Sequence, residues 1–175
     1  IMRNMLRRIL IPFLCLLGLF CTLQAQDAPG LKIAALHPIL GDMARAIGGS
    51  HVQVADLLRP NGNLHSFEPA PQDTAAAGQA RPVLASGKNL EPYLPKLKDA
   101  LGGRAQILDL GASIPDVPVA ADTADHDHGH DGDCCAHGPN DPHWWHTPAN
   151  MKRAARTLAA ALTRMDPAHE QDYKA

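Results

Sequence analysis

The chain has 175 residues, enough for one ordinary domain, and its 16 basic and 18 acidic residues give a formal net charge of −2. This balance argues against a nucleic-acid partner, because binding to nucleic acid needs a basic face. Only 4% of the residues are aromatic, and two of the four cysteines, Cys134 and Cys135, are adjacent, so no disulfide framework is expected.

The first 25 residues have the pattern of a cleaved secretory signal peptide. Arg3, Arg7 and Arg8 form a basic start, residues 9–23 are mostly apolar, and Ala25 is a small residue at a suitable cleavage position. The apolar run is shorter than the roughly 20 residues of a membrane span, which makes an uncleaved anchor the weaker alternative. Cleavage would leave 13 basic against 18 acidic residues, a balance of −5 that is compatible with a cationic ligand.

Short apolar segments alternate with amphipathic ones along the rest of the chain. The pattern predicts strands at 31–36, 52–57, 83–86 and 106–110, and helices at 39–48, 71–80, 92–101 and 148–165. Such alternation predicts an α/β fold with a four-stranded parallel sheet flanked by helices. Ligands of these sheets bind at loops beyond the carboxyl ends of the strands. His37 and the loop that carries His65 are therefore expected at the ligand-binding edge.

The strongest chemical signal lies in residues 125–138, which contain four histidines, four aspartates and two cysteines. Imidazole and thiolate are ligands for zinc and related metals, and tracts of this composition are typical of metal binding. We predict that the loop 122–140 gathers metal ions weakly, through His126, His128, His130 and His137. A solvated low-complexity loop is the alternative. Cys134 and Cys135 could ligate metal, oxidise or have no role.

Two more histidines lie on proline-rich loops. His65 begins a segment with prolines at positions 69 and 71, and His143 stands between Pro142 and Trp144, just before a predicted helix. Prolines restrict the backbone and indoles can supply a buried floor, so the second loop can hold an imidazole at the roughly 2.0–2.1 Å that zinc requires. Taken singly, His65 would more often be a surface residue than a ligand, and His143 could equally be a packing residue at the start of a helix.

Together these segments resemble the zinc-binding solute receptors of ABC transporters, the ZnuA-like family. The resemblance is carried, in chain order, by the strand and helix of 33–49, by 65–73, by Asn89-Leu90-Glu91-Pro92-Tyr93 and by Asp141-Pro142-His143-Trp144-Trp145. It covers about residues 30–175, and the acidic, His-rich insertion ahead of His143 is a feature that zinc members often show.

The resemblance implies two lobes with zinc in the cleft between them. Residues 26–165 would form the N-terminal metal-binding lobe, and residues 166–175 would be the truncated start of a long connecting helix, with the second lobe missing. His65 and His143 would be the two cleft ligands of this lobe. A further histidine, with a carboxylate or water, would come from the second lobe.

Other residues take lesser roles in this interpretation. Glu68 would support the first loop, and His37 would lie beside the cleft without binding the ion. His146, His51 and His169 are expected to be surface residues.

The resulting hypothesis is high-affinity zinc capture in the periplasm, by a monomer, and delivery to an ABC permease for zinc uptake. Zinc would be the substrate ion and not a catalytic cofactor. An exported His-rich metal buffer or chaperone is one alternative, and a manganese-type receptor of the same family is another, although manganese prefers more carboxylates. We expect no enzyme, because the chain has neither an H-E-x-x-H nor a G-x-S-x-G motif.

Overall fold

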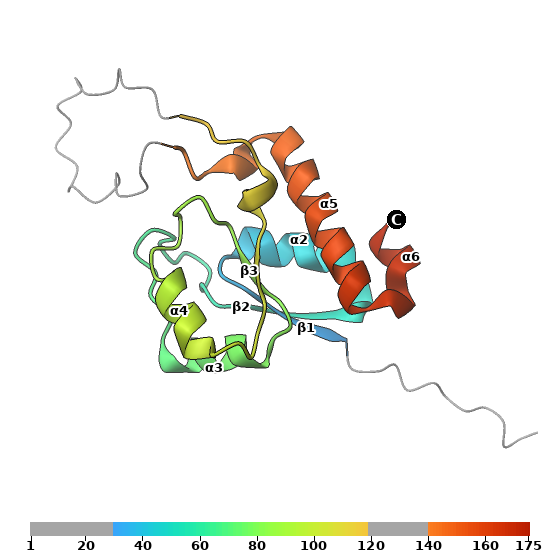
Figure 1. Cartoon of the computed structure of the whole chain (residues 1–175), viewed down its shortest axis with the longest axis horizontal. Helices are drawn as coiled ribbons and strands as arrows, with labels where there is room; N and C mark the ends of the chain where they lie inside the picture. The colour runs from blue at the N-terminus through green and yellow to red at the C-terminus, as the bar shows by residue number, and fades with distance from the viewer. Residues whose placement is uncertain (1–29, 119–139) are drawn as a thin grey trace, which may run out of the picture.

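The computed structural model describes residues 30–118 and 140–175 (Figure 1). Its strands are β1 (Leu31–Ala35), β2 (Val52–Asp56), β3 (Val83–Ala85) and β4 (Ile107–Asp109). They form one parallel sheet in the order β2-β1-β3-β4. The predicted α/β class and four-stranded parallel sheet are confirmed. The predicted signal peptide lies outside the described residues and stays a prediction.

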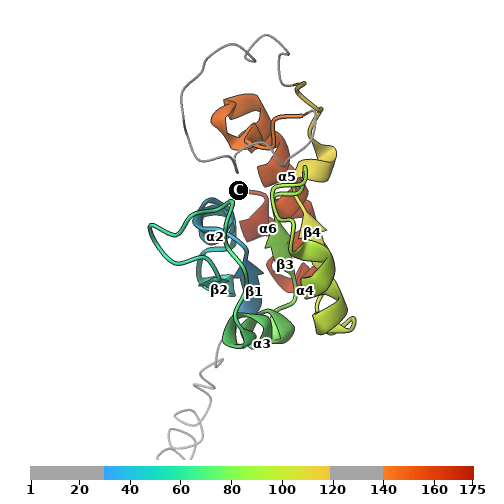
Figure 2. The ribbon, with the colours of Figure 1, turned by 90° about the vertical axis from the view of Figure 1, so that its left-hand side faces the viewer.

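Helices cover both faces of the sheet (Figures 1 and 2). One face carries α2 (Pro38–Gly48), α5 (Pro148–Met165) and α6 (Glu170–Tyr173), and the other carries α3 (Pro71–Gln79) and α4 (Leu94–Leu101). The four longer helices begin and end within two residues of the predicted positions. Within the two described ranges, no helix combines the length and apolar character needed to cross a bilayer.

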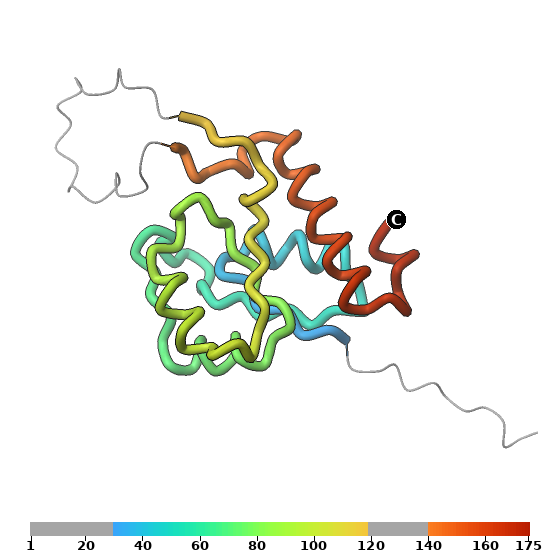
Figure 3. The backbone as a smooth tube through the Cα atoms, viewed as in Figure 1, coloured from blue at the N-terminus to red at the C-terminus, as the bar shows by residue number. Residues whose placement is uncertain are grey.

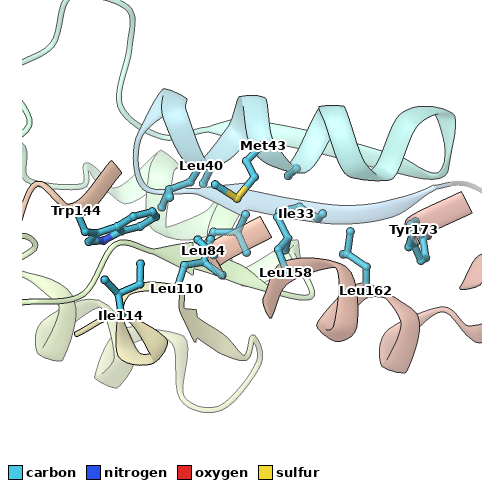
Figure 4. Packing of buried hydrophobic residues seen from close by; sticks show 13 residues of the cluster. Ile33, Leu40, Met43, Leu84, Leu110, Ile114, Trp144, Leu158, Leu162 and Tyr173 are labelled. Atoms are coloured by element: carbon cyan, nitrogen blue, oxygen red, sulfur yellow. The ribbon is translucent and has the colours of Figure 1, made fainter. Parts of the chain in front are cut away.

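The alternation of side chains along each strand divides the core into two clusters. Ile33 and Ala35 of β1 pack with α2 and α5, whereas Ala34 and the following Leu36 pack with α3 and α4. Burial on both faces is the reason that this strand has a continuous apolar sequence. The first cluster also contains Trp144, from the loop ahead of α5, at the end of the row of side chains opposite Tyr173 (Figure 4).

The segment after α5 packs back onto the lobe. Tyr173 of α6 is buried in the first cluster, and its hydroxyl donates to Asp166 Oδ2 at 2.6 Å. His51 and His169, expected to be ordinary surface residues, are half-buried and stack face to face, with ring centroids 3.8 Å apart. This contact joins the turn before β2 to the turn before α6. The assignment of 166–175 as the start of an inter-lobe helix stays a prediction.

In the sheet, β2 lies on one side of β1 and β3 lies on the other side. The strand order therefore changes direction between β1 and β3, which flank the topological switch point of the sheet. His37 follows β1 and Ser86 follows β3, and the two meet there, with His37 Nε2 2.5 Å from Ser86 Oγ. Both residues are buried. Burial lowers the pKa of His37 to about 4, so its imidazole is neutral at neutral pH.

The buried His37 predicts a specific loss of stability in acid. Between its folded pKa of about 4 and the ordinary value of 6.5, the unfolded chain binds more protons than the folded chain, so the free energy of unfolding falls as the pH falls through this window. The full difference is on the order of 3 kcal/mol. Denaturant unfolding should show the parent losing about this much stability relative to His37→Gln between pH 6.5 and about 4. Parallel pH profiles for the two proteins would contradict it.

Candidate metal site

Two loops that are distant in sequence bring His65 and His143 together. His65 lies on the loop after β2, and His143 lies directly before the 3-10 turn Trp144–His146 that leads into α5. Their Nε2 atoms are 3.3 Å apart, although 78 positions separate the residues. The ring centroids are 5.2 Å apart and the planes meet at 66°. The proximity of the two histidines, which the family resemblance implied, is therefore observed.

The His65 loop is held by contacts on both sides of the histidine. The side-chain oxygen of Asn63 accepts a hydrogen bond from the His65 backbone N–H at 2.9 Å, which forms a local turn. Further along, the ring of Phe67 packs edge-on against Tyr93, with centroids 5.5 Å apart. The Asp73 carboxylate then accepts from the Ala70 N–H at 2.8 Å and fixes the start of α3. The imidazole of His65 itself stays exposed.

The His143 loop is fixed by Asp141. One carboxylate oxygen, Oδ1, accepts the backbone N–H of His143 at 2.9 Å and its ring Nδ1–H at 2.6 Å. These contacts, led by the backbone hydrogen bond, hold the pKa of Asp141 below its usual value. A carboxylate at Nδ1 selects the tautomer that leaves a lone pair on Nε2, the atom that faces His65.

The distance between the two Nε2 atoms suits two ligands of one ion. Nitrogens that lie roughly 2.0–2.1 Å from a tetrahedral zinc ion are about 3.3–3.4 Å from each other. Without an ion, the same separation of 3.3 Å lets His65 Nε2–H donate to the lone pair of His143 Nε2. Binding of a metal would replace that proton, and His65 would then carry its hydrogen on Nδ1.

The pair supplies only part of a coordination sphere. Among residues 30–118 and 140–175, no group of three or more His, Cys, Asp or Glu side chains is arranged to hold an ion. Catalytic zinc sites have three protein ligands and structural sites have four, so two imidazoles alone fall short of either.

The remaining predicted residues lie around the pair or beyond the described chain. His146 is exposed, with its ring centroid 6.3 Å from that of His143. His37 lies beside the site, 5.2 Å from the Trp145 ring, which is itself 5.3 Å from His143. Glu68 is exposed and lines a surface pocket of about 200 Å³ next to α4. The auxiliary histidines His126, His128, His130 and His137 lie outside the described residues.

The described residues that border the His-rich segment show where the segment joins the rest of the chain. Pro118 and Asn140 form an isolated antiparallel bridge, and the Asp141 N–H donates to the Val117 carbonyl at 2.8 Å. The chain therefore enters and leaves residues 119–139 at one place (Figure 3), only three positions before His143.

A buried polar group beneath the site was not predicted. The Glu91 carboxylate accepts the backbone N–H groups of Ser86 and Gly87, at 2.7 and 3.0 Å. The Ser86 carbonyl accepts Trp144 Nε1–H at 3.0 Å. Burial is the main reason that the pKa of Glu91 rises to about 7. In the sequence, Glu91 was noted only as part of the segment 89–93 that carries the family resemblance. No role was predicted for its carboxylate.

The chain matches proteins of metal uptake. The family model described as ZnuA, "Zinc-uptake complex component A periplasmic", matches residues 33–175. The iron-binding protein YfeA of Yersinia pestis is 29% identical over 153 residues, covering 85% of this chain and 44% of YfeA. The manganese-binding lipoprotein MntA of Halalkalibacterium halodurans is 25% identical over 151 residues, covering 86% of this chain and 45% of MntA.

A solved structure agrees with this match. The crystal structure of ZnuA is similar with a TM-score of 0.68 and 28% identity, covering 83% of this chain and 51% of that chain. The chain thus spans about half the length of the relatives that it matches. The family match over residues 33–175, together with the shared fold, shows that this chain belongs to the ZnuA family.

Proposed function

We propose that this chain provides the His65 and His143 half of a zinc-capture site in a periplasmic solute-binding protein, which delivers the ion to the permease of an ABC transporter. The observation that carries the proposal is the 3.3 Å approach of the two Nε2 atoms. Asp141 supports it, because its contact with His143 Nδ1 leaves the Nε2 lone pair available to a cation. The other ligands would come from the part of such proteins that this chain does not span.

Zinc is proposed because the two donors of this half are imidazoles. Relatives of this chain are named for iron and for manganese, so family membership alone does not select the metal. Imidazole suits zinc, copper, iron and nickel, whereas manganese prefers sites richer in carboxylate. The histidines of segment 125–138 also favour zinc, and we propose that they gather ions close to His143.

Capture and release are favoured over catalysis. A zinc hydrolase needs three protein ligands, an open coordination position and a general base. The Asp141 carboxylate, which contacts the pair, is held to His143 Nδ1 on the ring edge away from the facing Nε2 atoms. The proposed partner is therefore a membrane permease, and the ion is the substrate that is carried.

Substitution of either histidine should remove one class of zinc site. We expect His65→Ala and His143→Ala each to lose one binding event in a calorimetric zinc titration of the 175-residue chain, because each removes one of two neighbouring donors. His146→Ala, which removes an exposed imidazole from the same loop, is the matched control and should keep that event.

The same titration separates the receptor from an exported metal buffer. A buffer would lose its binding when residues 125–138 are deleted and would keep it in both alanine variants. That pattern would overturn the proposed site.

Loss of the Asp141 charge should weaken zinc binding without removing a ligand. Carboxylates that hydrogen-bond a metal-binding histidine commonly change metal affinity by about 10–100-fold when they are mutated. We expect Asp141→Asn to bind zinc about tenfold more weakly in a competition assay with a fluorescent chelator. Asp99→Asn makes the same charge change on the exposed side of α4 and should match the parent. Equal affinity of Asp141→Asn and the parent would show that the carboxylate does not tune the site.

A further inference from the structure

We infer that Glu91 is a positioning residue for the histidine pair: it fixes the Ser86–Gly87 backbone, and through the Ser86 carbonyl and the Trp144 indole it fixes the loop that carries His143. The effect on zinc affinity rests on the proposed function. The positioning itself is a property of the metal-free chain and can be measured without zinc.

The first link is the contact between Glu91 and the loop after β3. Only 5% of Glu91 is exposed, and its two carboxylate oxygens accept two consecutive backbone N–H groups. The residues that follow are held in an unusual backbone conformation, with positive φ at Gly87, Lys88 and Asn89. Left-handed backbone is disfavoured for residues with a Cβ, so the loop needs a partner that holds it in this shape. The Glu91 carboxylate is that partner at the start of the loop.

The second link runs from Ser86 to Trp144. The Ser86 carbonyl accepts the indole N–H at 3.0 Å, and both residues are buried. A Cβ placed on Gly111 would lie 2.1 Å from the Ser86 oxygen and 3.1 Å from Trp144 Nε1, so Gly111 leaves the space that this hydrogen bond occupies. The indole is also packed in the core beside Leu110 and Ile114. Its position is thus set by polar and apolar contacts together.

The third link is covalent, because His143 directly precedes Trp144. An indole anchored in the core limits where the preceding backbone can lie, and Asp141 then orients the ring of His143 on that backbone. Ser86 also reaches the site by a second route, since its hydroxyl contacts His37 Nε2 and the His37 ring lies 5.2 Å from Trp145. Movement of the Ser86 backbone would therefore displace the His143 side of the pair.

A purely structural role for Glu91 would lower stability and leave the His143 ring unchanged, so the test must read the ring itself. Two variants interrupt the series of contacts from Glu91 to His143 at different places. Glu91→Gln exchanges one acceptor oxygen for an amide donor, and Trp144→Phe removes the indole N–H. Leu97→Ala is the control, because it opens a cavity in the cluster on the opposite face of the sheet.

The measurement is a histidine ring ¹H–¹⁵N correlation spectrum of the metal-free chain, followed by a zinc competition titration. Glu91→Gln and Trp144→Phe should each shift the His143 ring signals, leave those of His51 and His169 in place, and weaken zinc binding about tenfold. The double variant should bind zinc no more weakly than the weaker-binding single variant, because both changes interrupt the same series of contacts. Leu97→Ala should leave the His143 signals and the affinity unchanged.

The inference is overturned if Glu91→Gln and Trp144→Phe lower stability as Leu97→Ala does but leave the His143 signals and zinc affinity unchanged. If Glu91→Gln does not fold, Trp144→Phe decides the question by the same two readouts. If the ring signals shift as expected but the parent shows no site that needs His65 and His143, the positioning stands and the proposed function fails.

Discussion

The site depends on a scaffold that holds two imidazole nitrogens 3.3 Å apart. Two lone pairs that face each other at this distance repel, so a proton or a cation must lie between them. Because Asp141 engages His143 Nδ1, the His143 side of the pair presents a lone pair, and the proton between the rings has to come from His65. A cation bound by both nitrogens would take the place of that hydrogen, which would move to Nδ1 of His65, on a framework that is already in place.

That framework is built around the switch point of the sheet. Ser86 uses three polar groups there: its N–H binds Glu91, its hydroxyl meets His37 and its carbonyl accepts the Trp144 indole. Buried polar groups are stable only when they are satisfied, and a satisfied group of this kind makes a region rigid and specific. The rigidity lies under the loop of His143, whereas the imidazole of His65 is exposed on its own loop.

Much of the fold could be predicted from local pattern. Apolar runs located the four strands and helical spacing located α2, α3, α4 and α5, since strand and helix periodicity report burial directly. The meeting of His65 with His143 followed from the family resemblance, whereas parallel topology placed only the His65 loop and His37 at the ligand-binding edge. The Ser86–Glu91–Trp144 contacts and the stack of His51 on His169 could not be predicted, because they join segments whose partners no periodicity specifies. The signal peptide and the auxiliary histidines remain predictions.

The most direct test of zinc binding by His65 and His143 is the anomalous diffraction of a crystal of the 175-residue chain loaded with zinc. We expect a zinc peak at roughly 2.0–2.1 Å from Nε2 of both His65 and His143, with the Asp141 contact to His143 Nδ1 retained. Zinc bound only by residues of segment 125–138, with the two rings still in contact with each other, would contradict it.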